Sequence, residues 1–269
     1  MRLTVLVDNM CEKSSLMAEW GYAVHLETPH GNILLDTGGP CHVLLHNMAR
    51  LGVAAEKIDH IVLSHGHYDH VSGLGDAISR APSAVLWGAA GIATERRGDA
   101  DAGRFNGGGP LLELPAMRKV DPEAVILPGV TAFVVPQEAR DPAYQVKTNL
   151  WEVEKGGKVV PDTFADDLSL LVEGQYGVSL LLGCAHTGLP NILEYIRKHF
   201  GISSLYTVTG GTHLSAFSQE KLEVCLEQFR QFPIQRWRPN HCTGFAAAAA
   251  LAGTFADVRW AGAGATLDL

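Results

Sequence analysis

The sequence predicts an α/β fold in which two β-sheets pack face to face and helices cover their outer surfaces, a four-layer αββα sandwich. Two observations indicate this class. Short runs rich in β-branched residues alternate with helical segments in both halves of the chain. The chain has 269 residues, of which 46% are hydrophobic, so it can bury a large core. We expect a single domain over residues 1–269.

The first half of the chain is predicted to contain four strands and two helices. Apolar runs or period-two alternation predict strands at residues 3–7, 22–28, 32–36 and 58–64. The turn sequence PHGN at residues 29–32 joins the second and third of these strands as a hairpin. Apolar residues at helical spacing predict helices at residues 43–51 and 71–78.

The second half begins with a clear hairpin over residues 168–182, which turns at residues 174–177. Strands are expected at residues 203–209 and 234–239, and helices at residues 191–200, 219–232 and 245–255. The last helix, FAAAAALAGTF, is rich in alanine, so it is expected to pack closely against a sheet.

Between the two halves, residues 88–165 are rich in glycine and proline and only weakly periodic. They include the run RFNGGGP at residues 104–110. Long irregular segments in compact domains are usually functional or disordered, so we predict a lid-like insertion that recognises substrate rather than a packed layer. A merely decorative surface loop is the alternative.

A cluster of metal-binding residue types follows the strand predicted at residues 58–64. Residues 64–70 read SHGHYDH, which places His65, His67, Asp69 and His70 at the corner between this strand and the next predicted helix. Neutral imidazole and carboxylate are the ligands that Zn²⁺, Mn²⁺ and iron accept where no thiolate is offered. A solvated loop that is merely rich in histidine is the alternative, but such a loop has no need of a carboxylate between imidazoles.

The string HGHYDH resembles the HxHxDH signature of the metallo-β-lactamase fold superfamily, and the match is complete. Further similar strings are LLDTGG at residues 34–39, GCAHTG at 183–188, GGTHL at 210–214 and NHCTG at 240–244. Together they resemble a subgroup of metal-dependent hydrolases related to archaeal enzymes named dihydropterin ribofuranosylaminobenzene phosphate synthases. The resemblance implies the metallo-β-lactamase fold and metal-dependent chemistry.

Three further histidines follow predicted strands and are bracketed by glycines, an arrangement that lets side chains converge at the edge of a sheet: His186, His213 and His241. An ordinary buried or surface histidine is the alternative for each. We predict that one metal is held by His65, His67 and His186. The other metal is predicted to be held by Asp69, His70 and His241.

The sequence departs from the superfamily pattern in one respect. Many members carry a Gly-Asp pair whose carboxylate bridges two metals, but this chain has Gly183-Cys184 and Gly210-Gly211 at the expected places. Either Asp166 or Asp167 takes a related role, or His186 and His213 supply nitrogen donors instead, and the second option is preferred. Cys184 and Cys242 are expected to be small packing residues, with thiolate ligation as the alternative.

The implied activity is hydrolysis of an ester, phosphoester or cyclic amide or ester bond. Two divalent ions, expected to be zinc with manganese or iron as alternatives, would acidify water and polarise the bond under attack. Asp69 is predicted to orient the attacking water, and His213 to stabilise the oxyanion or protonate the leaving group. Asp36 and Asn9 are expected to orient metal-binding imidazoles, with a turn-forming role as the alternative for Asp36.

Three alternative functions are considered. The subgroup suggests a synthase that condenses a dihydropterin with a phosphorylated aminobenzene ribofuranoside. A non-catalytic metal-binding module would have its metals fully enclosed by protein ligands. An iron-based oxygen reductase would need a glutamate in place of His67, and usually a flavin domain.

Composition limits the partners. A formal charge of −8 and the absence of a basic run argue against a nucleic-acid surface. No apolar stretch approaches the roughly 20 residues of a membrane span, and charges after residues 1–8 interrupt any export signal. Five cysteines without CxxC spacing indicate a reducing cytoplasm. We expect a cytoplasmic enzyme acting on a small-molecule substrate; the sequence leaves its oligomeric state open.

Overall fold

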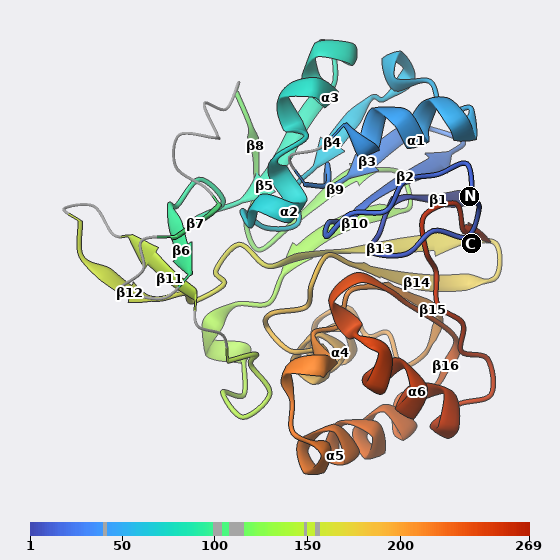
Figure 1. Ribbon diagram of the computed structural model, residues 1–269. Coiled ribbons are helices and arrows are strands. Elements are labelled where there is room, and N and C mark those ends of the chain that lie inside the picture. Colours follow the sequence, from blue (N-terminus) through green and yellow to red (C-terminus); the bar gives the residue numbers. More distant parts are fainter. Residues whose placement is uncertain (40–41, 99–103, 108–115, 148–149, 154–156) are drawn as a thin grey trace.

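The computed structural model describes residues 1–39, 42–98, 104–107, 116–147, 150–153 and 157–269. It contains two large sheets packed face to face, with helices on both outer surfaces (Figure 1). The first large sheet has the order β17 (Thr266–Asp268), β1 (Arg2–Val7), β2 (Ala23–Thr28), β3 (Gly31–Leu35), β4 (His60–Val62), β5 (Val85–Ala89) and β8 (Arg118–Val120). The predicted αββα sandwich is therefore confirmed.

The second large sheet has the order β16 (Ile234–Pro239), β15 (Leu205–Gly210), β14 (Gly177–Leu182), β13 (Leu168–Gly174), β10 (Val130–Val134) and β9 (Glu123–Leu127). The predicted hairpin of β13 and β14 turns between Gly174 and Gly177, which pair with each other. The strands β14, β15 and β16 run parallel, so their carboxyl ends lie at one edge of the sheet. That edge carries the functional residues described below.

The helices fall into two groups. The first group is α1 (Val43–Leu51), α2 (Tyr68–Val71) and α3 (Leu74–Arg80), and the second is α4 (Leu189–His199), α5 (Gln219–Arg230) and α6 (Phe245–Thr254). Figure 1 shows α1 and α3 on one side of the sandwich and α4, α5 and α6 on the other. Short 3₁₀ turns are η1 (Ala55–Lys57), η3 (Gln137–Ala139), η4 (Leu214–Ala216) and η5 (His241–Thr243).

The hydrophobic core forms three layers, as strand geometry requires. Leu168, Leu170 and Val172 of β13 point between the two sheets, whereas Leu171 points outward beneath the helices. This alternation follows from the two-residue period of a strand. Each fully buried side chain of this kind contributes about 1.5–3 kcal/mol relative to an exposed one. The outer layers are closed by α1 and α3 on one sheet and by the second helix group on the other.

The expectation of an unpacked insertion over residues 88–165 is wrong for its central part. Strands β8, β9 and β10 belong to the two large sheets, and Ala132 and Phe133 are buried. Their short lengths and the tight turn at Gly129 left no periodic pattern long enough to recognise. Part of the predicted insertion, including residues 108–110 of the run RFNGGGP, lies outside the described residues.

The rest of the segment includes a small separate sheet, with the order β12 (Val159–Pro161), β11 (Leu150–Val153), β6 (Arg96–Gly98) and β7 (Arg104–Gly107). It lies beside the end of the sandwich that carries α2 (Figure 1). A bridge between His67 and Gly107 joins β7 to the HGHYDH segment. The small sheet is therefore attached to the candidate metal loop.

Two predicted helices differ in detail. The helix expected at residues 71–78 is interrupted between α2 and α3, at Gly73. A Cβ on Gly73 would lie 2.1 Å from the carbonyl oxygen of Thr37, so the chain needs glycine to pass this close. The alanine-rich helix α6 exists, but only Ala247 and Leu251 are buried along it. Among the described residues, none of the helices is both long and apolar enough to cross a membrane.

Candidate metal centre

The HGHYDH segment starts directly after β4, where the chain turns into α2. Its turn is held from both sides. The backbone N–H of Gly66 donates to a carboxylate oxygen of Asp166 at 2.8 Å. A Cβ on Gly66 would lie 2.1 Å from the carbonyl oxygen of Ile92, so only glycine fits. The sequence of this segment therefore specifies one tight corner that directs its side chains inward.

The structure brings together both of the predicted ligand groups. Side-chain donor atoms of His65, His67 and His186 lie within 4.8 Å of one another. A second group within the same limit consists of Asp69, His70 and His241. All six residues are buried. Segments that are more than 100 residues apart in the chain thus converge at one sheet edge, and their binding of metal stays a prediction.

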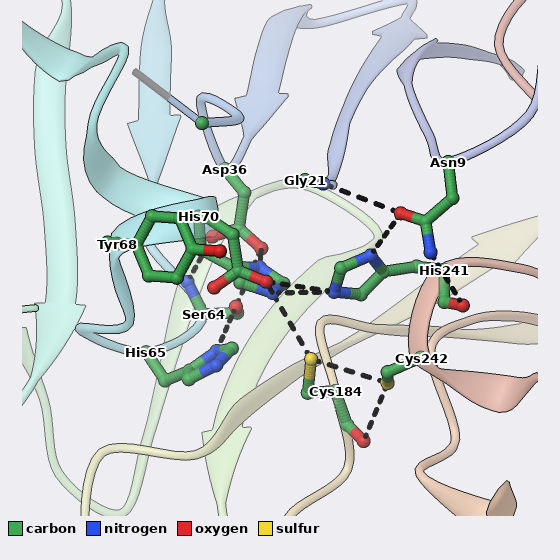
Figure 2. A network of polar contacts seen from close by, with 12 residues as sticks. Asn9, Gly21, Asp36, Ser64, His65, Tyr68, His70, Cys184, His241 and Cys242 are labelled. Atoms are coloured by element: carbon green, nitrogen blue, oxygen red, sulfur yellow. Dashed lines mark hydrogen bonds and ion pairs between the residues drawn. The ribbon is translucent and has the colours of Figure 1, made fainter. Parts of the chain in front are cut away.

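Asp36 orients one imidazole in each group (Figure 2). Its Oδ2 accepts a hydrogen bond from Nδ1 of His70 at 2.7 Å, which leaves a lone pair on Nε2 of His70. The same oxygen accepts the hydroxyl proton of Ser64 at 2.6 Å. The Ser64 oxygen must then accept from Nδ1 of His65, which lies 2.9 Å away. Nε2 of His65 is therefore also a lone-pair donor, as a metal ligand requires.

Asn9 has the same effect on His241. Its side-chain oxygen lies 3.0 Å from Nδ1 of His241, so that nitrogen carries the proton and Nε2 carries a lone pair. Figure 2 shows Nε2 of His241 directed at Nε2 of His70, and the two atoms are 3.2 Å apart. Two lone pairs at this distance repel each other unless a proton or a cation lies beside them. The predicted orienting roles of Asp36 and Asn9 thus have a geometric basis.

The electrostatics of the second group also favour positive charge. Burial alone would raise the pKa of Asp69, but the neighbouring imidazoles of His70 and His241 hold that pKa below its ordinary value. Burial would lower the pKa of His241, but its contact with Asp69, 3.4 Å away, raises it to about 9. The position between these side chains therefore favours positive charge, which a proton on Nε2 of His241 supplies and which a metal ion bound to that nitrogen would supply in its place.

The first group contains buried nitrogen atoms without partners. Nε2 of His65 and both ring nitrogens of His186 are buried and make no hydrogen bond. Burial, reinforced by the neighbouring imidazoles, lowers the pKa of both residues well below the usual value, which keeps the rings neutral. Leaving a buried donor or acceptor unpaired costs about 1–3 kcal/mol. A metal ion would satisfy Nε2 of His65 and one ring nitrogen of His186, so the residues present fit such an ion.

Asp166 and Asp167, considered as bridging carboxylates, do not lie among the ligand groups found in the described residues. Oδ1 of Asp166 accepts from Arg96 at 2.7 Å and its other oxygen accepts from Gly66. Oδ2 of Asp167 accepts from the backbone N–H of Thr187 at 2.8 Å. Both carboxylates therefore hold the backbone of segments that carry predicted ligands.

A buried arginine connects this framework to His67. Arg96 donates from Nε to Asp162 at 2.8 Å, and the same carboxylate oxygen lies 3.3 Å from Nε2 of His67. Because that contact places the proton on Nε2, Nδ1 of His67 is left with a lone pair. Arg96 and Asp162 were not predicted, since a charged residue in a weakly periodic segment carries no sequence signal of burial.

Two cysteines and His213 complete the centre. Sγ of Cys184 lies 3.1 Å from Nε2 of His70 and 3.4 Å from Sγ of Cys242. Cys184, His213 and Cys242 form a further group of donor atoms within 4.8 Å. Burial raises the pKa of the Cys184 thiol, so a thiolate at this position needs a cation beside it. His213 packs its ring 4.3 Å from that of His186.

The backbone around the centre is strained. Among the described residues, the five non-glycine residues with positive φ are Asp36, Phe164, Ala185, His213 and His241. Each of them either belongs to the donor groups or directly adjoins a member of them. Left-handed conformations of such residues cost of the order of 1–3 kcal/mol each and concentrate at functional sites. The strain therefore supports this sheet edge as the candidate functional site.

A small cleft gives access to the donor groups. It has a volume of about 130 Å³. Its walls include Trp20, Tyr68, Asn106, Asp69 and His213. Larger hollows lie elsewhere, for example about 560 Å³ beside α5 and α6, but no donor group lines them. The smaller cleft is lined by members of the donor groups and opens toward solvent.

Fold and site together define a class: an αββα sandwich with a histidine-rich metal-type cluster at one sheet edge. The sequence model of the metallo-β-lactamase superfamily matches residues 21–188. The chain belongs to the metallo-β-lactamase superfamily, as its motifs predicted.

Three comparisons place the chain among relatives. It is 32% identical over 253 residues to an uncharacterized protein of Methanocaldococcus jannaschii, and the match covers 91% of each chain. It is 27% identical over 233 residues to the 7,8-dihydropterin-6-methyl-4-(β-D-ribofuranosyl)-aminobenzene-5'-phosphate synthase of the same organism, covering 80% of this chain and 76% of that protein. A crystal structure described as a metal-dependent hydrolase of the β-lactamase superfamily shares the fold, with a TM-score of 0.86, 24% identity and coverage of 100% and 99%.

Proposed function

We propose that this protein is a metal-dependent hydrolase that acts on an ester, a phosphoester or a cyclic amide or ester. The proposal is carried by one observation. The two donor groups present lone pairs to common points beside a cleft that opens to solvent. Two divalent cations bound there, most simply zinc, would acidify water toward neutral pH and polarise the bond under attack.

Asp69 and His213 have distinct proposed roles in the reaction. Asp69 is the ionised carboxylate on the cleft wall, where it is placed to accept a hydrogen bond from the attacking water and orient it. His213 stands on the same cleft beside His186. Burial opposes protonation of His213, but the neighbouring Cys242 sulfur raises its pKa. A protonated ring there would donate to the developing oxyanion or to the leaving group.

The substrate is proposed to be a small molecule that places only its reacting group in the cleft. The volume of about 130 Å³ is below the range of roughly 300–1,000 Å³ that encloses a whole drug-sized ligand. Trp20 is 57% exposed at the rim, where its indole can cover a planar portion of the substrate. The cleft also opens the donor groups to solvent, which an enclosed, non-catalytic metal module would not require.

A second function is supported by the relative that is named as a synthase. In that case the same centre would assist condensation of a dihydropterin with a phosphorylated aminobenzene ribofuranoside. Incubating the purified protein with these two substrates, and separately with esters, lactones and phosphodiesters, distinguishes the functions. Condensation product without hydrolysis of any test compound would replace the hydrolase proposal by the synthase.

The role of Asp69 provides the direct test. Asp69→Ala removes the carboxylate that faces both His70 and His241, so we expect loss of one equivalent of bound metal and of turnover. Elemental analysis and the substrate screen measure both quantities on the same preparation. Asp76→Ala, at an exposed position on α3, is the matched control and should retain both. Full activity in Asp69→Ala would refute the scheme.

A further inference from the structure

We propose that the sulfur of Cys184 is a ligand shared by the two cations, in the place where a bridging carboxylate would otherwise stand. The inference deepens the proposed function and rests on its two-cation site. From the sequence, Cys184 was expected to be a packing residue, and the proposal assigns it a role as a metal ligand instead.

The position of the sulfur supports this role. Cys184 forms a group of donor atoms with His65 and His70, all within 4.8 Å of one another. One of these histidines belongs to each of the two predicted ligand groups. A donor that lies within reach of one member of each group stands between the two groups. Figure 2 shows the Cys184 side chain directed toward the lone-pair side of His70.

The surroundings of Cys184 differ from those of a packing cysteine. Cys225 is buried in an apolar cluster beneath α5, among leucine and phenylalanine side chains. Cys184 is equally buried but belongs to none of the apolar clusters found among the described residues. Its recorded side-chain contacts are an imidazole nitrogen and another sulfur. These contacts are those of a donor atom and contribute little hydrophobic stabilisation.

The backbone on both sides of Cys184 allows its side chain to enter the centre. A Cβ on Gly183 would lie 2.1 Å from the hydroxyl oxygen of Ser64, so glycine lets the end of β14 approach the HGHYDH corner. Ala185 then adopts a φ of 54°. This left-handed turn allows Cys184 and His186, two positions apart, to enter the same centre.

The net charge of the predicted site and the length of zinc–sulfur bonds both favour a thiolate at Cys184. The six predicted ligands carry one negative charge, that of Asp69, against four positive charges on two divalent cations. A cation that coordinates a thiol deprotonates it, which adds a second negative charge in a buried site. Two zinc–sulfur bonds of about 2.3 Å can span cations roughly 3.5–4 Å apart. Asp166 and Asp167, the carboxylates considered for a bridging role, hold backbone groups instead.

Cys242 acts as the hydrogen-bonding neighbour of this sulfur. Its Sγ lies 3.4 Å from Sγ of Cys184 and 3.7 Å from the carbonyl oxygen of Cys184. The Cys242 sulfur also lies beside His213, whose pKa it raises against the effect of burial. Cys242 is a positioning residue in this scheme, so its removal should leave the sulfur ligand in place.

Cadmium NMR tests the bridge without reference to activity. Cadmium-loaded protein should show two resonances, both shifted downfield because each ion has a sulfur ligand. In Cys184→Ala, one or both ions should be lost, and every resonance that remains should move upfield. Cys184→Asp should restore two bound ions with both resonances in the upfield, oxygen- and nitrogen-ligated range. Cys242→Ala and Cys11→Ala are the controls, and both should keep two downfield resonances.

The outcomes separate the two proposals. If two cadmium ions bind but neither resonance is shifted downfield by sulfur, the bridge is overturned and the hydrolase proposal stands. The same conclusion follows if only one of the two resonances responds to Cys184→Ala. Loss of the downfield shift in Cys242→Ala alone would assign the ligand to Cys242 and overturn the bridge too. A wild-type chain that binds no cation would overturn both proposals. Circular dichroism of each variant verifies that it is folded.

Discussion

Asp36 determines more of this site than its own position suggests. It bonds directly to His70 and indirectly, through the hydroxyl of Ser64, to His65. One buried carboxylate therefore selects the tautomer of a donor in each ligand group. Because a metal-bound imidazole depends on the partner of its second nitrogen, this pair of contacts links the two metal positions.

The Ser64 hydroxyl connects Asp36 to His65, so its removal should affect the two predicted metal positions unequally. Ser64→Ala leaves Nδ1 of His65 without an acceptor, while the contact between Asp36 and His70 is unchanged. We expect metal affinity to fall about 10–100-fold at the first position only, the effect usual for such supporting residues. Competition titration with a chromophoric chelator measures both affinities. Ser79→Ala, on the exposed part of α3, is the control, and equal weakening of both positions would contradict the relay.

At the residue scale, the sequence singled out residues of diagnostic type that the structure brings close together. A string of histidines with an aspartate is chemically unusual, and His186 and His241 stand in strings that match the family. Cys184 stands in the same string as His186, but a ligand cysteine and a packing cysteine look identical in a sequence, so thiolate ligation was only the alternative there. Arg96 and Asp162 were equally hidden, since their partners are distant in the chain and only the folded structure shows that both are buried.

At the scale of elements, two buried arginines hold the segment that adjoins the first ligand group. Arg96 pairs with Asp162 and Asp166. Arg140 donates to the carbonyl oxygens of Thr163 and Phe164. The segment carries Phe164, whose ring stacks on His186 at 4.3 Å. These contacts hold a loop without regular structure in place beside His186.

Arg96→Met tests this arrangement. The substitution leaves the buried carboxylates of Asp162 and Asp166 without their cation, which is expected to lower the free energy of unfolding by about 3–5 kcal/mol. Urea denaturation provides the measurement. Arg97→Met, at the next position, removes a half-exposed pair with Glu95 and should cost at most about 1 kcal/mol. Similar losses in the two variants would show that the buried network does not stabilise the fold.

Helices and strands were predicted correctly where their hydrophobic pattern was long, and they were missed where that pattern was short. Helix α1 and strand β16 have the predicted bounds, because each has clear periodicity and flanking turn residues. Strands β9 and β10 were assigned to an insertion, since these five-residue strands in a glycine-rich segment gain their stability from their partners, β10 from β13 and β9 from β10. Strand β17 was missed for the same reason, as its three residues are specified by β1.

At the scale of the molecule, the centre joins both halves of the sandwich. The first ligand segment follows β4 of one large sheet, whereas His186 and His241 follow β14 and β16 of the other. Cations bound between these segments would therefore cross-link the two sheets. Any ligand that binds only the folded state stabilises it in proportion to the logarithm of its concentration over Kd.

Metal removal should accordingly lower thermal stability. A cation present at a thousand times its Kd contributes about 4 kcal/mol. In a domain of this size each kcal/mol corresponds to about 2–4 °C in Tm. We expect excess chelator to lower the Tm by about 8–16 °C for each cation removed, measured by calorimetry, and added zinc to restore it. The Tm of the double variant His67→Ala, His241→Ala should not change with chelator or zinc. If the Tm of the wild-type protein does not change with chelator either, the proposed cross-link is excluded.

The contact between Asn9 and His241 spans 232 positions of the chain. During synthesis on the ribosome, HGHYDH emerges long before its distant partners, so the nascent polypeptide first exposes imidazoles that nothing yet orients against His186 or His241. The second ligand group is assembled only after residue 241 has left the exit tunnel and folded back beside residues 8 and 9. The predicted ligands of the second cation are therefore expected to be incomplete until at least 241 residues have been synthesised.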